Sequence, residues 1–478
     1  MNIISDIQNA FLPELIIFSF IIINIILALF PRKNSYKISK IINTAAIMFS
    51  GMSMFFIRIN PAFYAFNNSF TSNIFTTAFK IMILISALFV ILSSNNLIRE
   101  KRNKSFEFFA VFLSGILSGF SLVSSNDFIS AFLSIELLSV CCYFLCGFRN
   151  NHKSKEAALK YLITAAGSSA FFLLGISYIY GLSGNINLAE INDIFALTGI
   201  NAMFVISSLF IIFALMFKFG AIPFNNWITD VYEGSSYSVC AYLSLIPKIA
   251  AFGFVSRLFV FIFSFSPILQ IITACIALYT IVYASIGAIK QTNIKRIYAY
   301  SSVIHSGFIL LALSLADVYA LSGVIFYIFT YIFMNIGIWT ASIIYTTEYQ
   351  TDDINDYKGL FYKRPCFATA LAICLISLAG LPVTGGFIAK LYLFSALLRA
   401  DFIYLIILFI AMIAAVISLF VYFKIIGLLF EYPDNVITIT NKKILPKIIL
   451  YLCAVITVLI GIFPNEIIEL ARIAAYYM

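Results

Sequence analysis

The stretch FKFGAIPFNNWITDVYEG, residues 217–234, places a lysine and a helix-breaking proline at the end of a long apolar run. Pro223 lies five residues after Lys218, and Asp230 and Glu233 follow before the next apolar run begins. A proline inside a helix removes one backbone hydrogen bond and leaves the carbonyl four residues earlier, that of Phe219, without its helical partner. The stretch therefore predicts a helix that is interrupted close to a buried charge.

The composition around this stretch predicts that lipid, not water, surrounds most of the chain. Of the 478 residues, 62% are hydrophobic and only 11% are charged, which is more apolar surface than a soluble core can bury. Runs of about 20 apolar residues recur, and each can cross about 30 Å of hydrocarbon as a helix. We expect an all-α polytopic membrane protein with about 14 transmembrane helices. The expected spans are 11–31, 38–58, 74–94, 107–124, 127–148, 158–181, 201–228, 237–262, 267–289, 298–316, 319–346, 366–398, 402–430 and 447–468.

The basic residues gather in the loops that follow alternate spans. Twenty of the thirty Lys and Arg residues lie there: Arg32, Lys33, Lys37, Lys40, Arg99, Lys101, Arg102, Lys104, Arg149, Lys153, Lys155, Lys290, Lys295, Arg296, Lys358, Lys363, Arg364, Lys442, Lys443 and Lys447. Cytoplasmic loops collect Lys and Arg, so the odd-numbered spans run inward and both termini lie outside. The net charge of +9 is thus explained by topology, and it does not indicate a nucleic-acid partner.

Four charged residues lie deep inside the expected spans. Glu136 is in the fifth span, Lys218 in the seventh, Lys248 in the eighth and Lys390 in the twelfth. Each ionisable group at this depth costs a few kcal/mol unless it is paired or hydrated. A structural ion pair is one interpretation. A proton relay is the other, because a lysine buried in a medium of low dielectric titrates nearer to neutrality than one in water.

Other polar residues in the spans have simpler explanations as well. Lys160 and Lys424 lie close enough to an interface for their ammonium groups to reach water along extended side chains. His305, in the tenth span, is either a proton carrier or a packing residue with satisfied hydrogen bonds. We expect no metal site, because lysine is a poor ligand at neutral pH and carboxylates are few. The cysteines of CCYFLC, residues 141–146, act as small hydrophobic residues, and their spacing fits no Fe–S cluster.

A second interrupted helix is expected in the twelfth span. The segment LAGLPVTGGFIAK, residues 378–390, places Gly380, Pro382, Gly385 and Gly386 just before Lys390. Freed backbone groups at membrane depth require protein or water to satisfy them, and such breaks in corresponding positions of two halves indicate an ion path. The two breaks are five spans apart, which predicts inverted five-helix repeats. The expected units are 1–105 with three helices, 106–264 and 265–431 as the two repeats, and 432–478 with a C-terminal helix.

At these residues the chain resembles the antiporter-like membrane subunits of respiratory complex I (NADH:quinone oxidoreductase), and the subunit N type in particular. The resemblance covers nearly the whole chain. It is carried by SIELLSVCCYFL (134–145), EAALKYLITAAGSSAFFLLGISYIYGLSG (156–184), FKFGAIPFNNWITDVYEGSS (217–236), PKIAAFGFVSRL (247–258), QTNIKRIYAYSSVIHSGF (291–308) and SLAGLPVTGGFIAKLYLF (377–394). A lysine in the broken twelfth span and the DVYEG element fit subunit N better than its paralogues.

The resemblance implies a role for each buried charge. Glu136 and Lys218 would form the charged pair of a first half-channel. Lys248 would be the central lysine and Lys390 the terminal one on the exit side. Lys160 matches a family lysine at the start of the sixth span.

The chain also departs from the family pattern, which usually reads PFHxWxPDVYEGAP. Asn225 replaces the histidine, Thr229 replaces the proline before the aspartate, and residues 235–236 are both serine. Asn225 cannot titrate, so either the histidine is dispensable for protonation or water takes its place, and the amide can still hydrogen-bond a carbonyl freed near Pro223. Asp230, with Glu233, either pins the half-helix at the cytoplasmic face or is simply solvated.

The resemblance implies a proton-translocating subunit in a bacterial inner membrane, surrounded by the other membrane and peripheral subunits of complex I. The chain itself would bind no cofactor, because NADH, FMN, Fe–S clusters and quinone would belong to the wider complex. One rival is a subunit of a multisubunit sodium/proton antiporter. A second rival is a purely structural membrane spacer.

Overall fold

The protein is a bundle of long helices, seen here in a computed structural model that describes residues 11–30, 35–56, 62–94, 104–432 and 444–478. Its longer elements are α2 (Leu12–Ala28), α3 (Ser35–Ser53), α4 (Ile74–Ser93), α5 (Ser105–Ser124), α6 (Phe128–Gly147), α7 (His152–Ser183), α8 (Leu188–Thr198), α9 (Ala202–Phe219), α10 (Asn226–Gly234), α11 (Tyr237–Phe261), α12 (Pro267–Ile289), α13 (Ile294–Leu313), α14 (Val318–Tyr349), α16 (Pro365–Ala379), α17 (Gly385–Leu397), α18 (Phe402–Phe430), α19 (Ile444–Ile462) and α20 (Asn465–Tyr476). The loop residues Arg32, Lys33, Arg99, Lys101, Arg102, Lys442 and Lys443 lie outside the described residues.

The expected class, an all-α polytopic membrane protein, is confirmed. Twelve of the described helices are long and apolar enough to cross a bilayer, and three shorter apolar helices accompany them, namely α2, α16 and α17. The count of fourteen spans and the inverted repeats stay predictions, as do the unit boundaries at residues 105, 264 and 431. Beside the helices lies one small antiparallel hairpin of β1 (Phe63–Ala65) and β2 (Phe70–Ser72).

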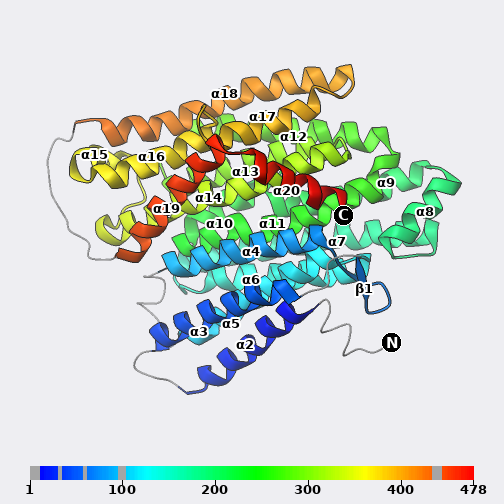
Figure 1. Cartoon of the computed structure of the whole chain (residues 1–478), viewed down its shortest axis with the longest axis horizontal. Helices are drawn as coiled ribbons and strands as arrows, with labels where there is room; N and C mark the ends of the chain where they lie inside the picture. Colours follow the sequence, from blue (N-terminus) through cyan, green and yellow to red (C-terminus); the bar gives the residue numbers. More distant parts are fainter. Residues whose placement is uncertain (1–10, 31–34, 57–61, 95–103, 433–443) are drawn as a thin grey trace.

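The helices lie roughly side by side, with α2 and α3 at one edge of the bundle and α18 at the opposite edge (Figure 1). Helix α11 runs through the centre, and every residue from Tyr237 to Phe259 is buried. Helix α14 packs against α11, α13, α16, α17, α19 and α20, which makes it the second central element. The buried charges of the centre are therefore set among α11, α13 and α14.

Asparagine and aspartate side chains start many of these helices. A side-chain oxygen at the N-cap accepts a hydrogen bond from a backbone N–H that has no partner within the helix. The caps are Asn73 of α4, Asp127 of α6, Asn151 of α7, Asn187 of α8, Asn201 of α9, Asn293 of α13 and Asp317 of α14. The many asparagines between the apolar runs thus determine where the helices begin.

The bundle has two opposite faces, and different helix ends and loops meet at each of them. The end of α6, the starts of α7, α11 and α13 and the end of α14 surround one cavity, on the side that the loop charges predict as cytoplasmic. We call this side the basic face. On the other side, Phe70 of the hairpin pairs with Ser125 at the end of α5, and Asp127 pairs with Asn187.

The structure corrects several expected boundaries. The sixth span begins at His152 rather than near 158, so α7 is 32 residues long. The fourteenth ends at Ile462 and not at 468, and the separate helix α20 follows. Helices α8 and α20 and the hairpin were not predicted, because each is too short to produce the pattern of a span.

Candidate functional site

The break expected near Pro223 is present between α9 and α10. Helix α9 ends at Phe219, and Gly220 follows in the left-handed conformation with φ of 66°, which glycine adopts without steric cost. The indole Nε1 of Trp227 donates to the carbonyl of Phe217 at 3.2 Å. An indole N–H and the N–H of Gly220 therefore both bond the carbonyl of Phe217 in the last turn of α9.

Asn225 does not have the role that was predicted for its amide. Its side chain is buried at 8% exposure, and no hydrogen bond from it is found among the described residues. The carbonyl of Phe217 is bonded by Trp227 instead, and the backbone N–H of Ile222 donates to the hydroxyl of Thr280 at 3.2 Å. The carbonyl that Pro223 frees is that of Phe219, and the described residues include no hydrogen bond from the Asn225 amide to it.

Lys218 lies in the last turn of α9 and is buried at 4% exposure. Its ammonium Nζ donates to the hydroxyl of Ser139 at 2.5 Å and approaches the carbonyl of Ile135 at 3.4 Å, both on α6. The ring of Tyr161 lies 6.0 Å from the same nitrogen. Neutral oxygens and an aromatic face thus surround this ammonium.

Glu136 is close to Lys218 in the fold but is not its direct partner. Its carboxylate accepts a hydrogen bond from the hydroxyl of Ser169 on α7, and the described residues include no ion pair between Glu136 and Lys218. Ile135 and Ser139 are four positions apart and share one face of α6, whereas Glu136 projects about 100° further round the helix. The two charges therefore lie on neighbouring helices without touching.

Lys248 is at the centre of α11 and points to α13. Its Nζ donates to the carbonyl of Ser302 at 2.9 Å, to the hydroxyl of Ser302 at 3.1 Å and to the hydroxyl of Ser306 at 3.0 Å. No carboxylate is among these partners, so three neutral oxygens satisfy the three N–H bonds of the ammonium group.

A small cavity of about 10 Å³ adjoins Lys248, which is about enough for one water. Ser306 and His305 line it, together with Tyr331 of α14. The hydroxyl of Tyr331 is buried without a partner among the described residues, and such groups are usually satisfied by ordered water.

His305 is buried at 1% exposure and bonds two tyrosines. Its Nδ1 lies 2.6 Å from the hydroxyl of Tyr327 on α14, and its Nε2 lies 3.2 Å from that of Tyr422 on α18. The hydroxyl of Tyr422 in turn lies 2.6 Å from that of Ser301. Both ring nitrogens are thus hydrogen-bonded. This arrangement fits both interpretations of His305, as a packing residue and as a proton carrier.

The second break lies between α16 and α17 and contains Lys390. Gly380 ends α16 in the left-handed conformation with φ of 83°, the same device as Gly220. Lys390 is the sixth residue of the second half-helix, and its Nζ donates to the carbonyls of Leu378 at 3.0 Å and Ala379 at 2.7 Å. The ammonium therefore lies at the C-terminal end of α16, where the helix dipole is negative.

The ring of Phe308 lies 5.5 Å from the Nζ of Lys390. Phe308 belongs to α13, as do Ser302, His305 and Ser306. Helix α13 therefore passes between Lys248 and Lys390 and offers each of them part of its surroundings.

Lys160 belongs to a different group at the basic face. Its Nζ lies 2.7 Å from a carboxylate oxygen of Asp230 and 2.9 Å from one of Glu156. Asp230 also pairs with Arg296 at 3.2 Å, and Glu233 pairs with Arg296 at 2.8 Å. The ion pairs tie α10 to α7 and α13, so Asp230 and Glu233 pin the half-helix rather than being simply solvated.

Sequence reasoning missed two buried cations near the opposite face. Lys80 of α4 forms an ion pair of 2.6 Å with Glu14 of α2, and both side chains are at most 9% exposed. Arg257 of α11 donates to the carbonyl of Ser125 and to the side chain of Asn126. Both residues were visible in the sequence as charges at the edge of a span, but their partners lie far away in the chain.

The described residues include no group of three or more His, Cys, Asp and Glu side chains that could hold a metal ion. All eight cysteines are free thiols, and six of them are buried.

Known proteins resemble this chain over most of its length. Residues 125–418 match the family model described as NADH:quinone oxidoreductase/Mrp antiporter, TM. NAD(P)H-quinone oxidoreductase subunit 2, chloroplastic, of Mesostigma viride is 34% identical over 97% of this chain and 95% of its own. NADH-quinone oxidoreductase subunit N 2 of Chloroherpeton thalassium is 31% identical over 97% of this chain and 94% of its own.

Two solved structures share the fold. A chain of respiratory complex I from Thermus thermophilus gives a TM-score of 0.81 at 22% identity and covers 96% of this chain and 99% of its own. A chain of the Mrp complex from Dietzia sp. DQ12-45-1b gives a TM-score of 0.83 at 18% identity, over 97% and 96%.

Proposed function

This chain belongs to the membrane-subunit family shared by NADH:quinone oxidoreductase and the Mrp antiporters, as a member of the subunit N type, and we propose that it carries protons across the membrane within complex I. Its relatives are named as subunits of NADH-quinone or NAD(P)H-quinone oxidoreductase. The chain would work beside other membrane subunits of such a complex, in a bacterial inner membrane with both termini outside.

The observation that supports this proposal most directly is the position of α13 between two buried lysines. Ser302 and Ser306 bond Lys248, and Phe308 contacts Lys390 two turns beyond Ser302. His305 lies between them with both nitrogens hydrogen-bonded. Ionisable groups in a membrane interior are costly and usually mark a path for ions or protons.

The first half of the path would run through Glu136 and Lys218. The two groups are on adjacent helices, with Lys218 bonded to α6 on both sides of Glu136. The hydroxyls of Tyr232 on α10 and Tyr242 on α11 are buried and have no partner in the part of the chain that the structure describes. Water at such hydroxyls would supply the hydrogen bonds through which protons move from Lys218 toward Lys248.

The free-energy scale of such a relay is reasonable. Moving one proton across each 100 mV of membrane potential costs about 2.3 kcal/mol. A change of about 2 units in the pKa of the group that carries the proton supplies about 2.7 kcal/mol. One relay step can therefore work against a substantial part of the membrane potential.

The chain itself would hold no redox centre and no cofactor. Electron transfer would take place in other subunits, and its free energy would reach the lysines by movement or by electrostatic coupling. Helix breaks at Gly220 and Gly380 are where such movement costs the fewest hydrogen bonds, because each half-helix already ends there.

The test is the number of protons pumped per electron by the reconstituted complex. Lys218→Ala and Lys390→Ala should assemble, continue quinone reduction and pump fewer protons per electron. Lys155→Ala, which removes an exposed lysine from the first turn of α7, should pump as the native complex does. Unchanged pumping in both Lys218→Ala and Lys390→Ala would refute the relay and favour a structural spacer.

The sodium/proton antiporter remains the alternative, because the same fold occurs in an Mrp complex. It predicts proton flux that depends on a sodium gradient and not on NADH oxidation. Measuring pumping in sodium-free medium with NADH as the only energy source separates the two.

A further inference from the structure

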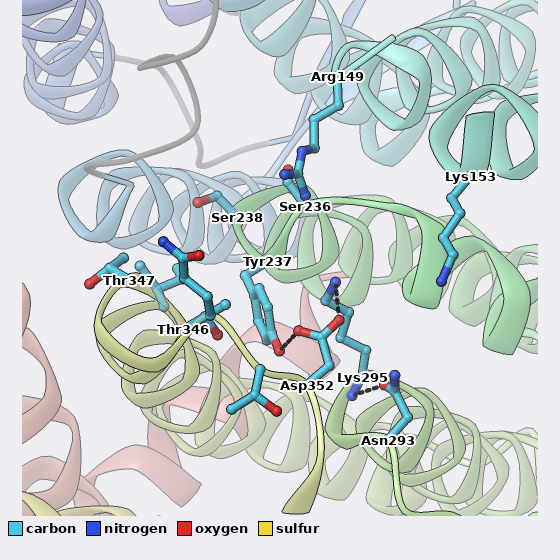
Figure 2. Close-up of a pocket in the computed structure, with 13 residues that line it drawn as sticks. Arg149, Lys153, Ser236, Tyr237, Ser238, Asn293, Lys295, Thr346, Thr347 and Asp352 are labelled. Atoms are coloured by element: carbon cyan, nitrogen blue, oxygen red, sulfur yellow. Dashed lines mark hydrogen bonds and ion pairs between the residues drawn. The ribbon is translucent and has the colours of Figure 1, made fainter. Parts of the chain in front are cut away.

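A cavity of about 850 Å³ opens on the basic face, where α11 and α13 begin and α14 ends (Figure 2). We call it the vestibule. Its lining residues are Arg149, Lys153, Ser236, Tyr237, Ser238, Asn293, Lys295, Ile343, Thr346, Thr347, Gln350, Thr351 and Asp352. All but one are polar or have a polar group, so water enters this cavity readily.

Three side chains on the wall of the vestibule, those of Tyr237, Lys295 and Asp352, contact one another. Lys295 Nζ lies 3.0 Å from one carboxylate oxygen of Asp352, and the hydroxyl of Tyr237 donates to the other at 2.6 Å. The ammonium also lies 4.5 Å from the centre of the Tyr237 ring. The Lys295 side chain is only 5% exposed, whereas that of Asp352 is 36% exposed. Figure 2 shows Asp352 between the phenol and the ammonium.

Buried polar groups continue inward from this wall along one face of α14. Thr346 lines the vestibule, and one turn deeper the Ser342 hydroxyl lies 3.5 Å from that of Tyr298 on α13. Trp339 comes next, and no described residue bonds its buried indole N–H. Positions 346, 342 and 339 are three or four residues apart and therefore share a face.

The same face reaches the central lysine. Asn335, one turn beyond Trp339, accepts from the hydroxyl of Ser244 at 2.9 Å. Ser244 is one turn of α11 from Lys248, and both residues line the small cavity beside Tyr331. The path from Tyr237 to Lys248 follows eleven residues of α11, or about 16 Å at 1.5 Å per residue.

Two backbone hydrogen bonds hold the chain around Asp352. Its carbonyl accepts from the N–H of Ile294 at 2.9 Å, and the N–H of Ile354 donates to the carbonyl of Thr292 at 2.9 Å. Helix α14 has already ended at Tyr349. The half-exposed carboxylate can therefore turn into the vestibule by side-chain rotation alone.

We propose that the vestibule is the cytoplasmic inlet for the protons that reach Lys248, and that the Lys295–Asp352 ion pair is its gate. This inference rests on the proposed function. With the pair closed, the buried Lys295 side chain and the Tyr237 ring separate vestibule water from Ser342 and the polar groups below. With the pair open, water connects the vestibule to this row of groups.

The proton balance of the gate is simple. A proton from vestibule water binds a carboxylate oxygen of Asp352, which removes the negative charge that holds Lys295. The neutral carboxyl group then gives its proton to water that has entered beside Thr346. The proton passes along water and hydroxyl groups to the neutral amine of Lys248, and Asp352 returns to Lys295 as a carboxylate.

The gate is tested by the accessibility of cysteines placed above and below it. In the assembled complex in inside-out vesicles, Thr347→Cys lies in the vestibule and Ser342→Cys lies below the gate. Labelling by a small, membrane-impermeant methanethiosulfonate is followed by mass spectrometry of each peptide, so that native cysteines do not interfere. Adding Asp352→Ala should speed labelling at Ser342→Cys by at least about tenfold and leave Thr347→Cys unchanged. An unchanged rate at Ser342→Cys would overturn the gate.

A sealed variant tests the inlet by function. Lys295→Met with Asp352→Leu replaces the ion pair by apolar side chains, a change that folded proteins often tolerate. Its pumping per electron should fall to the level of Lys248→Ala. The matched control, Lys358→Met with Glu431→Leu, removes a pair of 3.1 Å outside the vestibule and should pump normally.

The outcomes separate the inference from the proposed function. Normal pumping by the sealed variant, together with loss of pumping in Lys248→Ala, refutes the inlet and leaves the relay intact. Normal pumping by Lys248→Ala refutes the proposed function itself. If the sealed variant does not assemble, the labelling rates of Ser342→Cys decide.

Discussion

One methyl group added at Gly386, where the two halves of the second helix break are in tightest contact, should have a large effect on stability. A Cβ atom added to Gly386 would lie 1.9 Å from the carbonyl oxygen of Ser377 and 2.8 Å from its carbonyl carbon. Real Cβ atoms essentially never come within 3.0 Å of another heavy atom, so α16 and α17 must separate by more than 1 Å in Gly386→Ala. The hydrogen bond from the Gly386 N–H to the Ser377 hydroxyl, 3.0 Å long, would break.

The same displacement would pull Lys390 away from α16. Its bonds to the carbonyls of Leu378 and Ala379 are 3.0 and 2.7 Å long, and an added 1 Å removes most of their strength. Overpacking costs about 1–3 kcal/mol and the loss of hydrogen bonds to a charged group about 1.5–3 kcal/mol. We expect Gly386→Ala to destabilise the α16–α17 region by about 2.5–6 kcal/mol in total.

The assay compares Gly386→Ala with Gly427→Ala, both in the purified complex. An added Cβ at Gly427 meets no atom of the described residues within 4 Å, so this control should be neutral or slightly more stable, as Ala is a better helix former. Thermal aggregation gives stability, and proton pumping per electron tests the role proposed for Lys390. Adding Ser377→Ala should not rescue Gly386→Ala, because the clash is with backbone. Equal stability and pumping in the two glycine variants would refute the reasoning.

Three further predictions concern contacts that hold the bundle together. Lys80→Met should lower the stability by about 3–5 kcal/mol, because it leaves the Glu14 carboxylate buried and unpaired. The double variant Lys80→Met with Glu14→Leu should be nearly neutral, and thermal aggregation of the two complexes checks both expectations. Trp227→Phe should cost about 0.5–1.5 kcal/mol, since the carbonyl of Phe217 loses its side-chain donor but keeps the N–H of Gly220, and the same assay measures it. Arg296→Gln breaks two partly exposed ion pairs, which should cost about 0.2–1 kcal/mol each and less at high salt; melting at low and high ionic strength tests the salt dependence.

The sequence could predict where the charges lie but not what they touch. Lys218, Lys248 and Lys390 were visible because an ionised group is rare inside an apolar run. Their partners were not, since serines and backbone carbonyls occur throughout these helices and the choice among them depends on how each helix is rotated. The pairing of Glu136 with Lys218 illustrates this: neighbouring helices were predicted, yet a rotation of about 100° along α6 directs the carboxylate elsewhere.

Short elements were missed for a different reason. Helix α20 has 12 residues and α8 has 11, so neither forms an apolar run long enough to separate from a loop. Arg472 of α20 donates to the hydroxyl of Tyr392, two residues beyond Lys390. Arg472 was visible in the sequence as a charge near the C-terminus, but no spacing pattern connected it to the twelfth span.

Each of the two helix breaks begins with a glycine in the left-handed conformation, but the two breaks hold their lysines differently. Lys218 and Lys390 should therefore respond to different movements. Lys218 precedes its break and bonds to a neighbouring helix, α6, so sliding of α9 against α6 changes its surroundings. Lys390 follows its break and bonds to the first half of its own span, so a hinge between α16 and α17 is sufficient. A clash confined to that hinge, as in Gly386→Ala, should therefore disturb Lys390 and leave Lys218 on Ser139. A cysteine at Ile135, whose backbone carbonyl rather than side chain approaches Lys218, should then be labelled at the native rate in Gly386→Ala, and faster labelling would show that the two breaks move as one.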